Sequence, residues 1–197
     1  PFRVGHSIPD AMGIALRTPV GTVVTTGDFK FDQTPVDGRA PDFAILARLG
    51  QEGVVCLLSD STRAESPGYT PSERTVGEAF REIMEPLDGR VIVATFASNI
   101  ARVQQVLDAA ATFDRRTAVI GRSREQNFRV ASDLGYLASE PDAIVAKDRL
   151  SEVAAGKLVI CTTGAQGEPM AGLARMANRD VARHLSRTGI AVAALMA

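Results

Sequence analysis

Two residues near the amino end of the chain have the chemistry of metal ligands. His6 lies in a loop with Gly and Pro, residues 5–10, and Asp28 follows a strand-like segment that returns toward this loop. Neutral imidazole and carboxylate oxygen both bind zinc well, but two ligands fill only half of the roughly four positions that the ion needs. A hydrogen-bonded pair or a turn cap is the commoner alternative for such residues.

A further carboxylate, Asp60, comes directly after an apolar segment, residues 54–58. A carboxylate at this end of a strand can orient a catalytic histidine supplied from elsewhere, or it can cap the following turn. Both interpretations stay open. Cys56 and Cys161 each lie within apolar runs, so we predict buried, unpaired thiols rather than metal or redox groups.

Three polar loops each follow a predicted strand and precede a predicted helix. They span residues 96–99, 121–124 and 162–169. In open parallel sheets, ligands bind at the carboxyl ends of strands, and helix starts present N–H groups that suit a phosphate. The third loop is the most informative, because glycines on both sides of Gln166 permit close backbone approach. Ordinary turns with capping residues are the alternative for each loop.

The elements that position these residues divide into two parts. The first part is β-rich: residues 14–18 and 22–26 form a predicted hairpin, and residues 54–58 a predicted buried strand. Between them, residues 41–49 have helical spacing that is predicted to end at Gly50.

From about residue 70, strands and helices alternate, which predicts a parallel sheet with covering helices. We place the boundary near Pro71, between residues 1–70 and 71–197. Strands are predicted at residues 90–96, 117–120 and 157–161. Helices are predicted from a capping box made by Thr70, Pro71 and Glu73, from a cap at Ser98, and over residues 123–134 and 168–177.

Composition excludes several classes of protein. The 197 residues include 22 Lys and Arg against 23 Asp and Glu, and 45% are hydrophobic. These values exclude a disordered chain and a disulfide scaffold, and they disfavour a generic polyanion binder, although a local basic groove is allowed. No apolar run reaches the roughly 20 residues of a membrane helix, so we expect no membrane span and a cytoplasmic location.

Taken together, the motifs resemble ribonuclease J, a family of metallo-β-lactamase-fold nucleases with an inserted β-CASP domain. The matching stretches occur in the family's order over about residues 1–178. They are His6–Asp10, Thr26–Asp32, Leu58–Thr62, Pro67–Glu73, Ala94–Ile100, Val119–Ser123 and Cys161–Met170. The resemblance implies an α/β fold: the C-terminal part of a metallo-β-lactamase αββα lobe in residues 1–70, then the first half of a parallel-sheet β-CASP domain.

The resemblance also implies roles for individual residues. His6 matches the third metal-binding motif, and Asp28 matches the fourth, whose carboxylate bridges two zinc ions. Asp60 matches the first β-CASP motif, an acidic residue that contacts a catalytic histidine, here outside this chain. The β-CASP loops border the RNA channel; the RNA-binding candidates there are Ser98, Arg122, Ser123, Gly164, Gln166 and Gly167.

The activity that the resemblance implies is zinc-dependent hydrolysis of RNA phosphodiesters. Two zinc ions per site would activate water for in-line attack. Family members degrade RNA from 5′ to 3′, prefer a 5′-monophosphate and also cut internally, in RNA processing, including that of rRNA, and in RNA decay. They form dimers or tetramers.

The chain also departs from the family pattern. It begins at Pro1, and the family's His-x-His-x-Asp-His motif would lie before it, so we expect an incomplete chain that neither holds two zinc ions nor cleaves RNA by itself. Ala101 stands where relatives commonly have a histidine. The match fades from Arg179, and His184 matches no catalytic motif.

Two alternatives remain. One is another hydrolase of the same superfamily, arylsulfatase-like or DNA-directed, which the Phe-Ala-Ser-Asn and Ala-Gln-Gly-Glu-Pro stretches disfavour. The other is a non-catalytic RNA- or nucleotide-binding module, such as an inactive paralogue in a nuclease complex. This module would bind a nucleoside monophosphate without metal.

Overall fold

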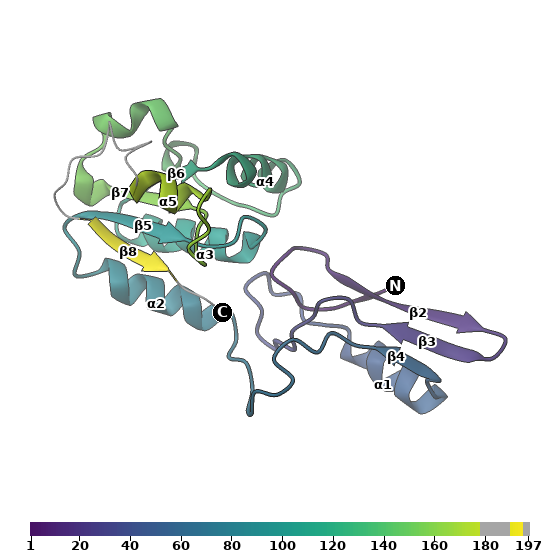
Figure 1. The fold of residues 1–197 in the computed structure, drawn as a ribbon. Helices are drawn as coiled ribbons and strands as arrows, with labels where there is room; N and C mark the ends of the chain where they lie inside the picture. The colour runs from purple at the N-terminus through teal and green to yellow at the C-terminus, as the bar shows by residue number, and fades with distance from the viewer. Residues whose placement is uncertain (178–189, 195–197) are drawn as a thin grey trace. The chain divides into compact units, whose positions relative to one another are not determined.

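The structure is a computed structural model that describes residues 1–177 and 190–194 (Figure 1). The chain divides into two compact units, Pro1–Thr75 and Val76–Ala197. The boundary predicted near Pro71 lies five residues before this division. Each unit has its own sheet and its own hydrophobic core.

The first unit contains a four-stranded sheet in the order β1-β2-β3-β4. The strands are β1 (Phe2–Arg3), β2 (Met12–Thr18), β3 (Gly21–Thr25) and β4 (Cys56–Leu58). Strands β2 and β3 form the predicted hairpin, and β4 pairs with β3 in parallel. The turn is tight because Thr18 pairs with Gly21, whose φ of 130° favours glycine.

Helix α1 (Phe43–Glu52) packs on one face of this sheet, where Phe2, Val24 and Leu49 are buried. The helix continues through Gly50, where it was predicted to end. A glycine inside a helix costs about 1 kcal/mol, which packing along the apolar face can offset. The helix ends instead at Gly53, whose φ is 91° and whose N–H donates to the Leu49 carbonyl oxygen (3.1 Å).

Strand β4 corrects a second prediction, because its side chains are exposed rather than buried. Cys56 is exposed, and Leu57 and Leu58 are 61% and 58% exposed. The strand pairs only with β3, and no element of the described chain covers it. An apolar run predicts that a strand can be buried, but burial also requires a partner surface.

The second unit contains a parallel sheet in the order β6-β7-β5-β8, which confirms the predicted fold class. The strands are β5 (Arg90–Ala94), β6 (Arg116–Ile120), β7 (Leu158–Thr162) and β8 (Ile190–Ala194). Strand β8 was not predicted, because its alanines are poor strand formers and it lies in the small-residue apolar run at the end of the chain. It pairs with β5 along its whole length.

Both faces of this sheet are covered, as a parallel sheet requires. Helices α2 (Arg74–Met84), α3 (Ile100–Thr112) and α4 (Arg122–Asp133) pack on one face, against side chains such as Val91 and Val93. The opposite face, which includes Ile92, packs against helix α5 and the segment between β6 and β7. These elements are α5 (Gly172–Ala177) and the 3₁₀ turns η1 (Pro141–Ala143), η2 (Lys147–Glu152) and η3 (Ala155–Lys157).

Helix α2 begins at Arg74, not at the predicted capping box. The Ser72 hydroxyl accepts a hydrogen bond from the Arg74 N–H (3.3 Å), so Ser72 replaces Thr70 as the capping side chain. In the predicted capping box the Glu73 N–H would donate to the Thr70 side chain. It donates instead to Asp32 Oδ2 (2.8 Å), so the box does not form. A carboxylate distant in sequence therefore decides where the helix starts.

Asp32 is a buried carboxylate of the first unit that accepts several hydrogen bonds. It is 6% exposed and accepts hydrogen bonds from the Ser72 hydroxyl (3.0 Å), the Glu73 N–H and the Thr34 N–H (3.0 Å). Burial by itself would raise the pKa of Asp32. The hydrogen bonds from Glu73, Ser72 and Thr34, together with the charge of Lys30, nevertheless hold this pKa below its ordinary value of 3.8.

We expect Asp32→Asn to lower the free energy of unfolding by about 1–3 kcal/mol at pH 7, because the amide has one acceptor oxygen where the carboxylate has two. Because the pKa of Asp32 is lower in the folded than in the unfolded protein, its ionised carboxylate stabilises the fold at pH values above the unfolded-state pKa. This stabilisation is lost as the pH falls through the folded-state pKa. The difference between the proteins should therefore shrink in urea unfolding below about pH 4. The control Asp37→Asn, at an exposed carboxylate bonded to the Arg39 N–H, should change little. A pH-independent difference would contradict this account.

Candidate functional site

Three loops of the first unit meet at the carboxyl ends of β3 and β4. These two strands are parallel, so the chain leaves both of them at the same edge. The Lys30 N–H donates to the Gly5 carbonyl oxygen (2.7 Å), which joins the loop after β3 to the loop before β2. The Phe29 N–H donates to Asp60 Oδ2 (3.4 Å), which joins it to the loop after β4. The residues predicted as a site therefore share one neighbourhood.

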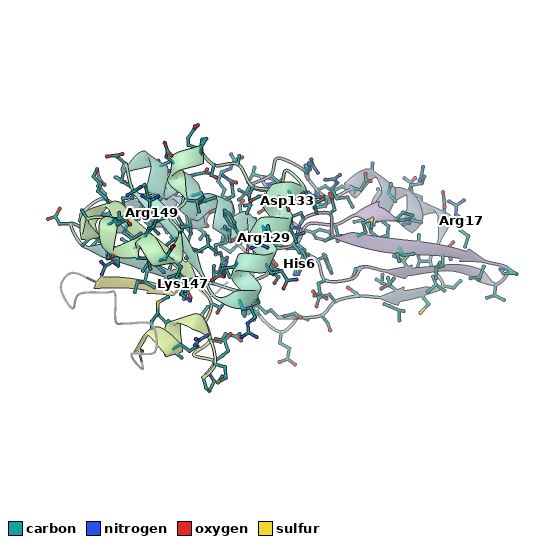
Figure 2. The ribbon with its side chains drawn as sticks, turned by 90° about the horizontal axis from the view of Figure 1, so that it is seen from above. His6, Arg17, Arg129, Asp133, Lys147 and Arg149 are labelled. Atoms are coloured by element: carbon teal, nitrogen blue, oxygen red, sulfur yellow. The ribbon has the colours of Figure 1, made fainter. Side chains whose placement is uncertain are left out.

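His6 and Asp28, the two predicted metal ligands, lie close together in the structure. Their Nε2 and Oδ2 atoms are 3.8 Å apart, and the side chains are 33% and 80% exposed; His6 is labelled in Figure 2. Two ligands each about 2.0–2.2 Å from a zinc ion lie no more than about 4.4 Å apart, so this pair fits one shared ion. Within the described residues no third His, Cys, Asp or Glu completes such a group.

Asp60 caps the turn that follows it, which is one of its two predicted roles. Its Oδ1 accepts from the Thr62 N–H (2.8 Å), and its own N–H donates to Thr26 Oγ1 (3.0 Å). Hydrogen bonds from Thr62 hold the pKa of Asp60 below its usual range. The Phe29 N–H and the charge of His6 lower this pKa further, whereas partial burial acts in the opposite direction. The carboxylate is therefore ionised at neutral pH. Its orientation of a histidine outside this chain stays a prediction.

In the second unit, strand register aligns the three predicted loops. Ala94 at the end of β5 and Ile120 at the end of β6 both pair with Thr162 at the end of β7. The Thr162 hydroxyl also donates to the Ile120 carbonyl oxygen (3.0 Å), and the Thr95 N–H donates to the Thr162 carbonyl oxygen (3.1 Å). The loops therefore begin from one row of residues at the carboxyl edge of the sheet.

The loop after β5 differs from its prediction in its capping residue. Helix α3 is capped by Asn99, whose Oδ1 accepts from the Arg102 N–H (3.0 Å), and not by Ser98. Asn99 is buried, whereas Ser98 is exposed. The capping task is therefore met by a buried amide, and the Ser98 hydroxyl is left at the surface of the loop.

The loop after β6 leads directly into helix α4. Gly121 has a φ of 121°, and its N–H donates to Glu125 Oε1 (3.0 Å), which fixes the turn into the helix. Arg122 and Ser123 occupy the first helical turn, and both are exposed. A guanidinium, a hydroxyl and the N–H groups of a helix start therefore lie close together.

The loop after β7 is longer than predicted, because helix α5 begins at Gly172 rather than at residue 168. The Gly167 N–H donates to the Gly164 carbonyl oxygen (3.1 Å), and a second turn runs from Glu168 to residue 171. Gly164 is buried with a φ of 116°, whereas Gln166 and Gly167 are exposed. The glycines thus permit a compact turn that presents Gln166 outward.

Sequence reasoning missed one polar residue at this edge, Arg124. Its side chain is fully buried, and it shares the inward stripe of helix α4 with Phe128 and Ala131. The spacing of four and seven residues places all three on one face, so an arginine in that stripe was the available signal. His184, by contrast, lies outside the described residues.

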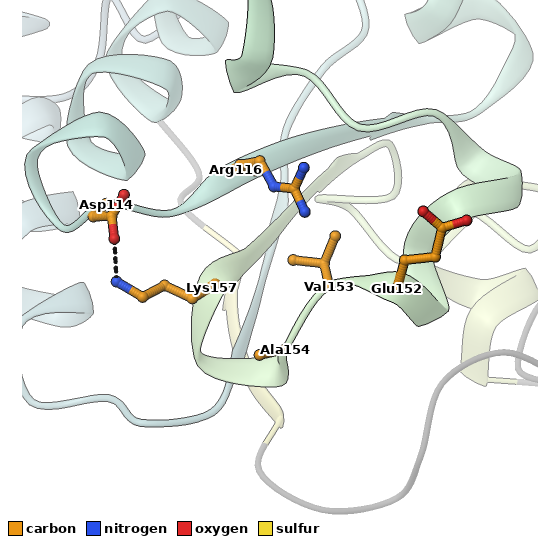
Figure 3. A pocket seen from close by; sticks show the side chains of 6 residues that line it. All are labelled: Asp114, Arg116, Glu152, Val153, Ala154 and Lys157. Carbon is orange, nitrogen blue, oxygen red and sulfur yellow. Dashed lines mark hydrogen bonds and ion pairs between the residues drawn. The ribbon is translucent and has the colours of Figure 1, made fainter.

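A cavity of about 290 Å³ lies at the opposite edge of this sheet (Figure 3). Its walls include Arg116 at the start of β6 and Lys157 just before β7, and Lys157 Nζ contacts Asp114 Oδ2 at 2.5 Å. The charges of the two basic side chains, Arg116 and Lys157, are balanced by those of two acidic ones, Asp114 and Glu152. None of the predicted site residues lines the cavity, so we assign it no role in the site.

None of the described helices is long and apolar enough to cross a lipid bilayer.

We expect Asp60→Ala to loosen the loop that carries Asp28, because the Phe29 and Thr62 N–H groups lose their acceptor. Amide hydrogen exchange in residues 27–34 and 60–63 should become faster than in the wild type. The control Glu65→Ala removes an exposed acid from the neighbouring turn and should leave exchange in residues 27–34 unchanged. Equal exchange in the Asp60 variant and the wild type would show that other contacts hold the loop.

Comparison with known proteins gives consistent relatives. A family profile described as "Ribonuclease J, beta-CASP domain" matches residues 88–189. Ribonuclease J of Mycobacterium tuberculosis is 49% identical over 179 residues, 91% of this chain and 32% of the relative. Ribonuclease J of Corynebacterium glutamicum is 47% identical over 179 residues, 91% of this chain and 25% of the relative. Ribonuclease J2 of Bacillus subtilis is 44% identical over 178 residues, 90% of this chain and 32% of the relative.

These alignments cover most of this chain but a minor part of each relative. The chain spans between a quarter and a third of the length of these curated relatives. The profile match extends to residue 189, beyond Arg179, where the resemblance was expected to fade.

Proposed function

This chain belongs to the ribonuclease J family, and on that premise we propose that the protein hydrolyses RNA phosphodiester bonds with the help of two zinc ions. The observation that carries the proposal is the meeting of His6 and Asp28, with Nε2 and Oδ2 3.8 Å apart, in a chain 49% identical to a ribonuclease J. Family membership favours RNA over the substrates of other metallo-β-lactamase-fold hydrolases.

In this proposal His6 and Asp28 supply part of the zinc-binding set. Zinc ions, when bound, lower the pKa of a water molecule and neutralise charge on the phosphate. His6 would supply an imidazole nitrogen and the exposed Asp28 would supply carboxylate oxygens. Asp60 holds the Asp28 loop through the Phe29 N–H and so keeps the ligand in place.

The carboxyl edge of the second unit is proposed to bind the RNA. Its exposed guanidinium, hydroxyls and amides are the donors that contact phosphate oxygens in protein–nucleic acid complexes. The exposed residues are Ser98, Arg122, Ser123, Gln166 and Gly167, and the buried Gly164, also among the predicted residues, shapes the turn that presents Gln166.

Several finer properties follow the family and remain predictions for this protein. They are 5′-to-3′ exonuclease action together with internal cleavage, preference for a 5′-monophosphate, a part in rRNA processing, assembly as a dimer or tetramer, and a cytoplasmic location.

We expect His6→Ala and Asp28→Ala, made in the full-length protein, to lower kcat on a 5′-phosphorylated RNA by at least about a hundredfold, because each loses a zinc ligand. Zinc affinity measured by chelator competition should fall in the same variants. The control Asp37→Ala removes an exposed carboxylate outside the cluster and should alter neither quantity.

Unchanged turnover by either variant would remove the metal assignment. The 197-residue chain by itself supplies two ligands in its described part and should hold fewer than two tightly bound zinc ions. Metal analysis that finds two would contradict this. A full-length protein that binds a nucleoside monophosphate without metal, and cleaves no RNA, would favour the non-catalytic alternative.

We expect Arg122→Ala to raise KM for RNA about three- to tenfold with little change in kcat, because it removes a contact to phosphate rather than a reacting group. The dependence of log Kd on log salt concentration should also become shallower by about one. The control is Arg149→Ala, which removes a paired arginine of η2 (Figure 2). Equal salt slopes for the Arg122 variant and the wild type would remove Arg122 from the RNA surface.

A further inference from the structure

Two side chains of helix α4 hold three consecutive carbonyl groups in the loop after β5. Arg124 Nη2 donates to the carbonyl oxygens of Thr95 and Phe96, the latter at 2.7 Å. Asn127 Nδ2 donates to the carbonyl oxygen of Ala97 (3.0 Å). The two side chains lie three residues apart on the helix and therefore act from one face.

These contacts also set the direction of the neighbouring N–H groups. The peptide bonds of the loop are trans, so each N–H points opposite to the carbonyl of the same peptide unit. Because the Phe96 and Ala97 carbonyls point toward helix α4, the Ala97 and Ser98 N–H groups point away from it. Ser98 is exposed and Ala97 is half-buried, so the Ser98 hydroxyl lies at the surface on the side to which the two adjacent N–H groups are directed. Adjacent backbone N–H groups of this kind form an anion-binding concavity.

The burial of Arg124 is not explained by stability. Its side chain is 0% exposed, its Nε and Nη1 have no hydrogen-bond partner, and within the described part of the chain no carboxylate pairs with it. Burial lowers the pKa of this guanidinium. A buried cation without a counter-charge destabilises a fold, whereas an apolar side chain of similar length would pack without that cost. The charge therefore serves something other than packing.

We propose that Arg124 and Asn127 are positioning residues that turn the loop of residues 95–99 so that its outward N–H groups receive a phosphate of the RNA. The buried guanidinium adds positive potential beneath the loop, where the described chain offers it no anion. The choice of an RNA phosphate as the ligand rests on the proposed function. The positioning of the loop rests on the contacts that Arg124 and Asn127 of helix α4 make with its carbonyl groups.

The test compares Arg124→Met with the wild type in the full-length protein. Methionine keeps much of the length of arginine and removes its charge. Binding of a 5′-phosphorylated RNA oligonucleotide with a 3′ fluorescein is followed by anisotropy, with a chelator present to prevent cleavage. We expect Kd to rise about tenfold, while the melting temperature stays within about 4 °C of the wild type, because relief of the buried charge offsets the lost carbonyl contacts.

Two further variants separate charge, position and packing. Arg129→Met removes the same charge from an exposed position of helix α4, labelled in Figure 2, and should change Kd less than about twofold. Asn127→Ala removes one carbonyl contact at the helix surface without changing charge, and should raise Kd about threefold and speed hydrogen exchange at Ala97 and Ser98.

An unchanged Kd in Arg124→Met, or a rise that comes with a larger fall in melting temperature, overturns the inference. Should that variant not fold, the Asn127 variant decides: an unchanged Kd and unchanged exchange at Ala97 and Ser98 overturn the inference. A wild type that binds the oligonucleotide but cleaves no RNA refutes the proposed activity and leaves the binding comparison valid. A wild type that binds no RNA overturns both.

Discussion

The register of the parallel sheet is the constraint on which the carboxyl edge of the second unit, our proposed RNA-binding edge, depends. Ala94 and Ile120 both pair with Thr162, so three chain segments leave the sheet in one row. Residues that are 68 positions apart in the sequence, Ala94 and Thr162, are thereby paired at this edge. The helices that cover both faces of the sheet keep this row intact, because a shift by one residue would exchange the buried and outward faces of a strand.

Side-chain hydrogen bonds then decide the shape of loops that have no regular structure of their own. In the first unit, Asp60 holds Phe29 and Thr62, and Asp32 holds Glu73 at the start of helix α2. In the second, Arg124 holds the loop after β5 through its carbonyls. Each case places a charged group where several backbone groups need a partner. Charged hydrogen bonds are stronger than neutral ones and fix loop geometry more firmly.

The two units differ in how completely they bury their apolar residues. The second unit covers both faces of its sheet, whereas β4 of the first leaves Leu57 and Leu58 largely exposed. The same kind of apolar run therefore has two outcomes in one chain. Burial of an apolar strand face is favourable in free energy, but the face is buried only where another element packs against it.

The sequence by itself determined what depends on neighbouring residues: the hairpin with its glycine turn, the alternation of strand and helix, and the ligand chemistry on which the proposal of a metal site at His6 and Asp28 rests. Helix and strand periodicity and ligand chemistry are local properties, so these predictions needed no partner. Only the tertiary structure decided that Asn99 rather than Ser98 caps α3, that Asp32 displaces the start of α2, and that Arg124 is buried beneath a loop. Each of these outcomes is a competition for hydrogen bonds or for space between groups distant along the chain, and the winner depends on which backbone comes within bonding distance.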